Sequence, residues 1–201
     1  MTILTATFEN LARKIVEDRP TPTELKRIVR ERKPTTISFS DDGVVPNNPR
    51  WPMLVYRKAV VLRNDTFKPE TIIDALFSGN GWRRSWRSSI YDYLHYHSQI
   101  HEALGVARGS AEVQFGGVKG RTLTLAAGDV VVLPAGTGHQ LLKSSRDFLV
   151  VGAYPSDGRY DECTDTRDRQ RTTKLISKVK KPKSDPIYGK QGLIATWTSR
   201  K

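Results

Sequence analysis

The chain has 201 residues, of which 37% are hydrophobic and 27% charged, a composition that suits one folded domain with polar extensions. No stretch approaches the ~20 consecutive apolar residues of a membrane-spanning helix, and the N-terminal residues lack the apolar core and cleavage site of a secretory signal, so we expect a cytoplasmic protein. The single cysteine, Cys163, excludes an internal disulfide and a cysteine-based zinc cluster. Any bound metal must therefore be held by histidine and carboxylate.

The formal net charge of +12 is unevenly distributed. Residues 159–201 hold twelve Lys and Arg against five Asp and Glu, which is more than half of the whole surplus. Because such charge runs are usually solvated, we expect a basic, solubilising C-terminal arm over 159–201. Nucleic acid is a less favoured partner.

The N-terminal part, residues 1–34, is predicted to be a helical extension with two short helices. The first has helically spaced apolar residues at Phe8, Leu11, Ile15 and Val16. The second begins at Thr21-Pro22-Thr23-Glu24, where Thr21 can cap the helix and Glu24 can bond back to the cap.

From residue 35 the pattern changes to short β-prone segments separated by turn residues. We expect a strand over 54–62 and a short helical insertion over 69–77, ended by Gly79-Asn80-Gly81. Seven further runs follow at close intervals, over 90–97, 102–107, 111–115, 121–125, 130–133, 140–143 and 148–154. Many short strands with glycine-rich turns indicate an all-β sandwich, jelly roll or barrel, which we place at 35–158 with its central motifs in 88–155.

Three of the four histidines lie within seven residues. His95 and His97 are two residues apart, so on a strand both imidazoles point to the same face. Glu102 begins the next predicted strand, and His139 follows the turn at 134–138. A carboxylate beside neutral imidazoles favours a divalent ion, and these four residues are candidate metal ligands.

His101 is an alternative ligand, because it is adjacent to Glu102 and would face the opposite side of a strand that is already extended there. Glu102 has the same parity as Leu104 and Val106, which should line the interior. A bend at 98–100 would change this parity, so a set of His97, His101 and His139 stays open.

The motifs His95-x-His97-x4-Glu102-x6-Gly109 and Gly128-x5-Pro134-x-Gly136-x2-His139 resemble, in order and spacing, the two sequence motifs of the cupin superfamily. The resemblance implies a double-stranded β-helix, the cupin jelly-roll barrel, with one divalent metal on His95, His97, Glu102 and His139. The sequence departs from the family at Lys143, where many cupins have Asn at a position that is not a ligand.

The chain further resembles the uncharacterised YjlB-like cupins over about three quarters of its length. The matching features are Asp41-Asp42-Gly43 with Pro46-Asn47-Asn48-Pro49, the segment 97–106 and the segment 133–139. This group has no assigned reaction to carry over.

Three histidines and one glutamate leave positions open on an octahedral ion, which favours an enzyme that acts on a small oxygenated metabolite, of the dioxygenase, isomerase or lyase type. Glu102 could also act as a general base, with Tyr91, Tyr93 and Arg108 as substrate contacts. These donors do not distinguish Fe, Mn, Ni, Cu and Zn. The alternative is a non-catalytic cupin that binds a sugar or metabolite.

Two expectations concern partners. By analogy with cupins that pair through N-terminal strands, residues 35–62 are a candidate homodimer arm. The segment Trp82–Arg87 interleaves aromatic residues with arginines, as binders of single-stranded nucleic acid do. It is one short segment, and we expect its tryptophans at the barrel mouth or a subunit interface.

Overall fold

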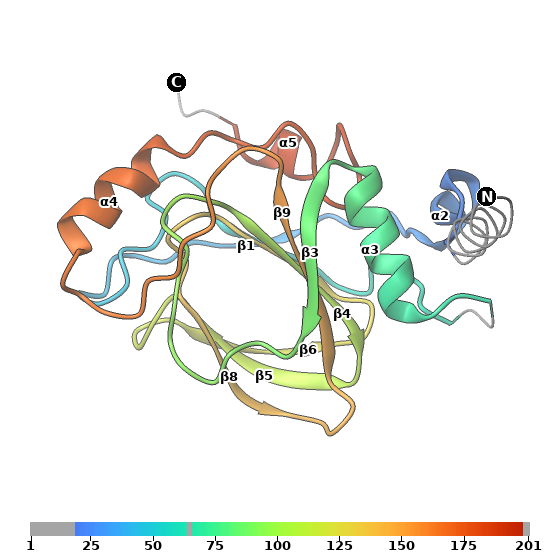
Figure 1. The fold of residues 1–201 in the computed structure, drawn as a ribbon, viewed down its shortest axis with the longest axis horizontal. Coiled ribbons are helices and arrows are strands. Elements are labelled where there is room, and N and C mark those ends of the chain that lie inside the picture. The colour runs from blue at the N-terminus through green and yellow to red at the C-terminus, as the bar shows by residue number, and fades with distance from the viewer. Residues whose placement is uncertain (1–18, 64–65, 199–201) are drawn as a thin grey trace, which may run out of the picture.

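The computed structural model describes residues 19–63 and 66–198, in which two antiparallel sheets face one another (Figure 1). The larger sheet has the strand order β1 (Thr35–Ile37), β2 (Met53–Tyr56), β7 (Val130–Leu133), β4 (Glu102–Arg108), β9 (Leu149–Pro155) and β3 (Trp82–Ser88). The smaller sheet has the order β6 (Arg121–Ala126), β5 (Ser110–Phe115) and β8 (His139–Ser144). This is the all-β, jelly-roll architecture that the sequence predicts. The first predicted helix lies outside the described residues.

The core between the two sheets is filled by alternate residues of the strands, as the period of two requires. In β4, Leu104 and Val106 are fully buried in this core, together with Val113 and Phe115 of β5. The neighbouring Ala103 belongs to a second core on the other face of the larger sheet. The predicted parity of β4 is confirmed.

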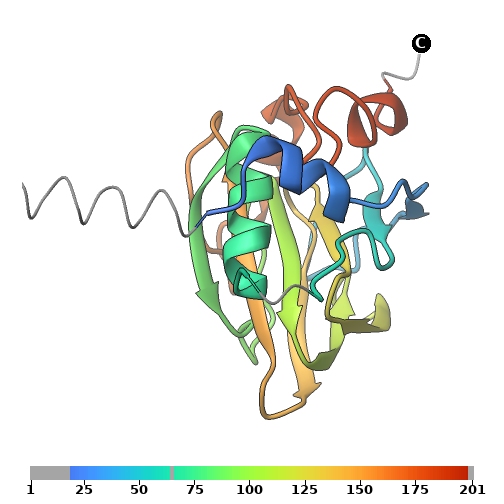
Figure 2. The same ribbon diagram turned by 90° about the vertical axis from the view of Figure 1, so that its right-hand side faces the viewer.

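The outer face of the larger sheet is covered by helix α3 (Pro69–Gly79), which Figure 2 shows in front of the strands and running roughly along them. This is the predicted helical insertion, with Pro69 at its start and Ile72, Ile73 and Phe77 packed against the sheet. Helix α2 (Pro22–Ile28) forms beside it with the predicted capping box, in which the Thr21 amide donates to Glu24 Oε2 at 2.7 Å.

The C-terminal segment also covers this outer face, through Ile187 and the region of α5 (Leu193–Thr196). Helix α4 (Arg169–Lys178) lies elsewhere, with Ile176 packed against Val45 and Tyr96. Leu193 and Trp197 are buried in the same core as α3. Asp185 is completely buried and accepts a hydrogen bond of 2.6 Å from the Tyr56 hydroxyl. The prediction of a solvated tail is therefore wrong for the described part of 159–201: its few apolar residues are anchors, although many charged residues lie between them.

Two of the predicted strands differ from the structure, and one strand of the structure was not predicted. The strand over 54–62 ends at Tyr56, where a turn begins and Lys58 takes a positive φ of 50°. The segment 90–97 does not form a strand, because its consecutive residues His95 and Tyr96 bond to two different segments. Conversely, Trp82–Ser88 is edge strand β3, which its aromatic and arginine residues had concealed. None of the helices in the described residues is long and apolar enough to cross a membrane.

Candidate metal centre

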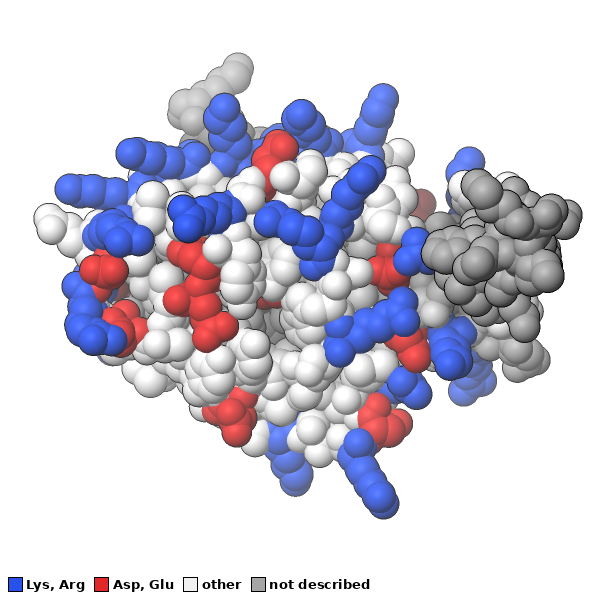
Figure 3. All heavy atoms as spheres, viewed as in Figure 1, with Lys and Arg blue, Asp and Glu red and all other residues white. Residues whose placement is uncertain are grey.

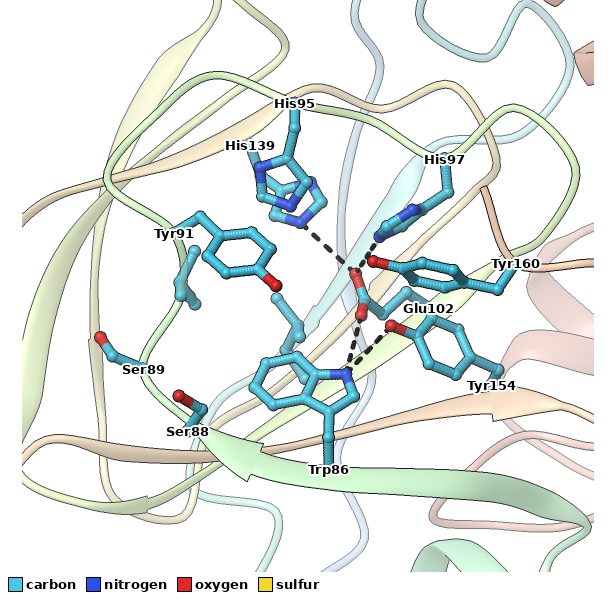
Figure 4. A pocket seen from close by; sticks show the side chains of 12 residues that line it. Trp86, Ser88, Ser89, Tyr91, His95, His97, Glu102, His139, Tyr154 and Tyr160 are labelled. Carbon is cyan, nitrogen blue, oxygen red and sulfur yellow. Dashed lines mark hydrogen bonds and ion pairs between the residues drawn. The ribbon is translucent and has the colours of Figure 1, made fainter. Parts of the chain in front are cut away.

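Three histidines meet between the sheets at one end of the barrel (Figure 4). His95, His97 and His139 are each at most 5% exposed. One nitrogen from each lies within 4.8 Å of one from each of the others. The structure thus brings together the three imidazoles that the sequence motifs predict.

The segment that carries His95 and His97 is extended but pairs with two different partners. The amide of His95 donates to the carbonyl of His139 at 3.2 Å, and the amide of His139 donates back at 2.9 Å. The next residue, Tyr96, makes the equivalent pair of bonds with Cys163, at 3.0 and 2.9 Å. Because consecutive residues bond to different segments, no strand ladder forms, yet the side chains of His95 and His97 still project to the same side (Figure 4).

Each of the three imidazoles has its Nδ1 against a backbone carbonyl oxygen. The acceptors are the carbonyl oxygens of Tyr93, 3.1 Å from His95, of Thr137, 3.2 Å from His139, and of Asp161, beside His97. A carbonyl oxygen can only accept, so each Nδ1 carries the proton of the neutral ring. Every Nε2 then has a free lone pair, which is the form in which histidine binds a metal.

Glu102, the first residue of β4, completes the cluster. Its Oε2 atom lies 3.3 Å from His97 Nε2 and 3.4 Å from His139 Nε2. This oxygen is buried and has no hydrogen-bond partner among the described residues. A buried carboxylate oxygen that faces imidazole lone pairs is unfavourable unless a cation lies among them. The donor set therefore fits a divalent metal ion.

Burial and the contacts within the cluster shift the pKa values of His95, His97 and Glu102. Burial and the neighbouring His139 lower the pKa of His95 to about 3, so that its imidazole is neutral. For His97, burial lowers the pKa but the negative charge of Glu102 outweighs it and raises the pKa. Burial raises the pKa of Glu102, but the attraction of His97 and the contacts with His139 outweigh burial, so that the pKa is lowered and the carboxylate stays ionised.

His101, the alternative ligand, is not part of this cluster. Its Nδ1 accepts from the Ala135 amide at 2.9 Å, and its Nε2 lies 3.0 Å from the Lys180 carbonyl, to which it donates. The ring packs against the stacked pair of Trp51 and Trp197, with centroids 5.4 and 5.1 Å away. Burial lowers the pKa of His101 to about 4. Both of its nitrogens are occupied, so it serves the structure of the loop that leads to His139.

A cavity of about 300 Å³ opens on the cluster. Its lining consists of Trp86, Ser88, Ser89, Ile90, Tyr91, His95, His97, Glu102, Leu104, His139, Tyr154 and Tyr160. Of the expected substrate contacts, Tyr91 lies in this lining. Tyr93 does not, since its hydroxyl donates to Glu162 at 2.9 Å, and Arg108 donates to Glu70 at 3.2 Å at the far end of β4.

Two residues of the cavity lining, Trp86 and Tyr160, were not identified as site residues from the sequence. Trp86 donates its Nε1 hydrogen towards Tyr154 Oη at 3.0 Å and Glu102 Oε1 at 3.3 Å, which fixes the oxygen that does not face the histidines (Figure 4). Tyr160 belongs to the segment that had been predicted to be a solvated arm. The tryptophan cluster was the only signal for Trp86, and nothing local marks Tyr160.

Two facing antiparallel sheets, with three imidazoles and one carboxylate directed into the space between them, define this protein as a jelly-roll barrel with a candidate metal centre. No family model matches the chain. YjlB, an uncharacterised protein of Bacillus subtilis, is 43% identical over 169 residues, which are 83% of this chain and 98% of YjlB. The chain belongs to the same family as YjlB.

Solved structures with partial likeness include a mutant of Bacillus subtilis oxalate decarboxylase (17% identity, 56% of this chain, 22% of that chain, TM-score 0.32). Another is acireductone dioxygenase from Bacillus anthracis with a cadmium ion in its active centre (15% identity, 43% of this chain, 59% of that chain, TM-score 0.31). The chain thus spans less than two thirds of the length of either protein. The assignment of the fold depends on the strand order described above.

Proposed function

We propose that the protein is a metal-dependent cupin enzyme that acts on a small oxygenated metabolite. The observation that carries the proposal is the buried Glu102 Oε2, which lacks a hydrogen-bond partner among the described residues and faces Nε2 of His97 and of His139. The cavity beside it has about 300 Å³, the lower end of the range of small-molecule sites, which is roughly 300–1,000 Å³.

His95, His97, Glu102 and His139 are the residues that would hold the ion. When bound there, a divalent metal supplies Lewis acidity that polarises a carbonyl or enolate oxygen. The protein itself orients these ligands. Backbone carbonyls fix the imidazole tautomers, and Trp86 fixes one oxygen of Glu102. Glu102 is also the candidate general base, because its carboxylate lines the cavity in which a substrate would lie.

Metal analysis of protein purified without chelator tests this proposal. We expect about one divalent ion per chain in the wild type and much less in His97→Ala, because that variant loses one of the four ligands. Glu102→Gln should lower the affinity strongly. Its matched control, Glu112→Gln on the exposed face of β5, should leave it unchanged. A wild-type protein without metal, even when supplied with iron, manganese, nickel, copper and zinc salts, would overturn the proposal.

Turnover distinguishes the enzyme from the alternative, a cupin that only binds a sugar or metabolite. Uptake of dioxygen by the metal-loaded protein with candidate substrates separates dioxygenase from isomerase or lyase chemistry. Bound metal with ligand binding but no turnover would support the non-catalytic alternative.

We place the protein in the cytoplasm, where its partner is a small-molecule substrate. We also propose a homodimer that pairs through residues 35–62. Strand β1 lies at an edge of the larger sheet, where its open side can accept a strand from a second copy. Sedimentation of the full chain tests the dimer.

A further inference from the structure

The lining of the cavity differs in charge from the rest of the protein. Among its lining residues in the described part of the chain there is no Lys or Arg, although the protein has 33 of them. Figure 3 shows that basic side chains gather along the rim of this face, whereas mainly uncharged side chains surround the central hollow. The basic character of the protein therefore stops short of the cavity.

The arginines nearest to the cavity in the sequence are engaged elsewhere. Arg84 donates to the backbone carbonyls of Pro155 and Gly158, at 3.4 and 3.2 Å, and its guanidinium is held over the ring of the lining residue Tyr154, 5.9 Å from the ring centroid. Arg87 pairs with Asp74 of α3, at 3.5 Å, on the outer face of the sheet.

Arg159 is directed away in the same manner. It lines a separate depression, together with Lys178 and Lys180. These basic side chains therefore do not compensate a negative charge inside the cavity.

The acidic groups in and beside the cavity also disfavour a ligand with added negative charge. The Glu102 carboxylate lies inside the cavity, and Glu162 lies beside it, where its carboxylate accepts from the hydroxyls of Tyr160 at 3.1 Å and Tyr93 at 2.9 Å. A divalent ion and Glu102 together carry one net positive charge. One ionised ligand oxygen neutralises that charge, and a second negative group would be desolvated without a partner.

The walls of the cavity are ring faces and hydroxyls. Trp86, Tyr91, Tyr154 and Tyr160 supply aromatic surface, and Ser88 and Ser89 supply small polar groups at the mouth. Aromatic walls with few polar groups suit a flat or ring-shaped ligand. Resting on the proposed function, we propose that the substrate is an uncharged ring compound with neighbouring oxygen atoms, which carries no carboxylate or phosphate.

Calorimetric titration of zinc-loaded protein with matched ligand pairs tests this substrate class. The pairs are catechol with 3,4-dihydroxybenzoate, and galactose with galacturonate, in which only the second member carries a carboxylate. We expect at least one neutral member to bind, about tenfold more tightly than its carboxylate partner. The pair that shows binding distinguishes an aromatic from a sugar ring.

A charge placed at the mouth should change this preference. Ser88→Lys puts a cation at an exposed lining position, so the carboxylate member should gain affinity and the preference should fall. Ser177→Lys, exposed on α4, adds the same charge outside the cavity and should have no effect.

The outcomes separate the two proposals. A chain that retains none of iron, manganese, nickel, copper and zinc contradicts the proposed function. A zinc-loaded protein that binds neither neutral compound, or binds the carboxylate partners equally well, overturns the substrate class and leaves the metal centre intact.

Discussion

The position of a single indole nitrogen connects the edge strand β3 to the metal centre. Trp86 can lie across β9 because residue 152 is a glycine: a Cβ there would come within 2.0 Å of the indole ring. From this place Trp86 Nε1 reaches Glu102 Oε1, while Oε2 stays free to face the histidines. The orientation of the carboxylate is therefore set by a residue that is not itself a ligand.

Trp86→Phe keeps an aromatic ring but removes the N–H group. We expect metal affinity to fall by about tenfold, because loss of a group that orients a ligand typically costs 10–100-fold. Titration with zinc measures this effect. Trp51→Phe, outside the cavity lining, is the matched control, and equal affinity in both variants would show that the indole N–H does not position Glu102.

His101 should make the stability of the metal-free protein depend on pH. Its pKa is about 4 in the folded protein against 6.5 for an ordinary histidine, so the unfolded chain binds the proton more readily. The contribution of neutral His101 to the free energy of unfolding is complete above pH 6.5. This free energy falls by about 3 kcal/mol as the pH falls towards 4. Urea unfolding across this range checks it. His101→Asn should flatten the pH dependence, and parallel curves for the two proteins would contradict the assignment.

At the scale of elements, the segment after β9 is a wall of the site rather than a tail. Asp161 holds the histidine segment by its carboxylate, which accepts from the amides of Ser98 at 2.9 Å and Gln99 at 3.1 Å. Its backbone carbonyl accepts from His97 Nδ1. The neighbouring Cys163 pairs with Tyr96. One short segment thus orients His97 and fixes the course of the chain that carries it.

Asp161→Ala should loosen this connection. We expect a loss of ~2 kcal/mol in the free energy of unfolding, since two amides lose their acceptor, and weaker metal binding because the histidine segment is no longer fixed. Asp157→Ala, on an exposed residue nearby, is the control. Urea unfolding and zinc titration of the two variants check both effects, and unchanged values for Asp161→Ala would refute the role of the segment.

For the whole molecule, the larger sheet is covered on both faces, by the smaller sheet on one side and by α3 with the C-terminal segment on the other. Asp185 is the polar anchor of this second layer. Besides the Tyr56 hydroxyl, its carboxylate accepts from the amides of Ile187 and Leu193, both at 2.7 Å, and of Tyr188 at 2.9 Å. The C-terminal segment is thereby part of the fold.

Asp185→Ala should destabilise the protein by about 3–5 kcal/mol, because four buried donors lose their acceptor at once. Asp165→Ala is the comparison, since that carboxylate is exposed and bonds only within its own turn, to Arg167. Thermal and urea unfolding of both variants decide the matter: equal stability would mean that the C-terminal segment is not anchored through Asp185.

The sequence by itself determined most of the short strands, the cap of α2 and the helix predicted over 69–77, and its two motifs marked the four candidate metal ligands. These follow from local rules, namely alternation along strands, capping chemistry and the spacing of two motifs, so neighbouring residues suffice to predict them. Tertiary structure alone decided that His101 bonds to Lys180 and Ala135, that Trp86 orients Glu102, and that Tyr160 lines the cavity. Each of these depends on contacts between segments distant in the sequence, such as Trp86 across Gly152, whose closeness arises only when the barrel closes.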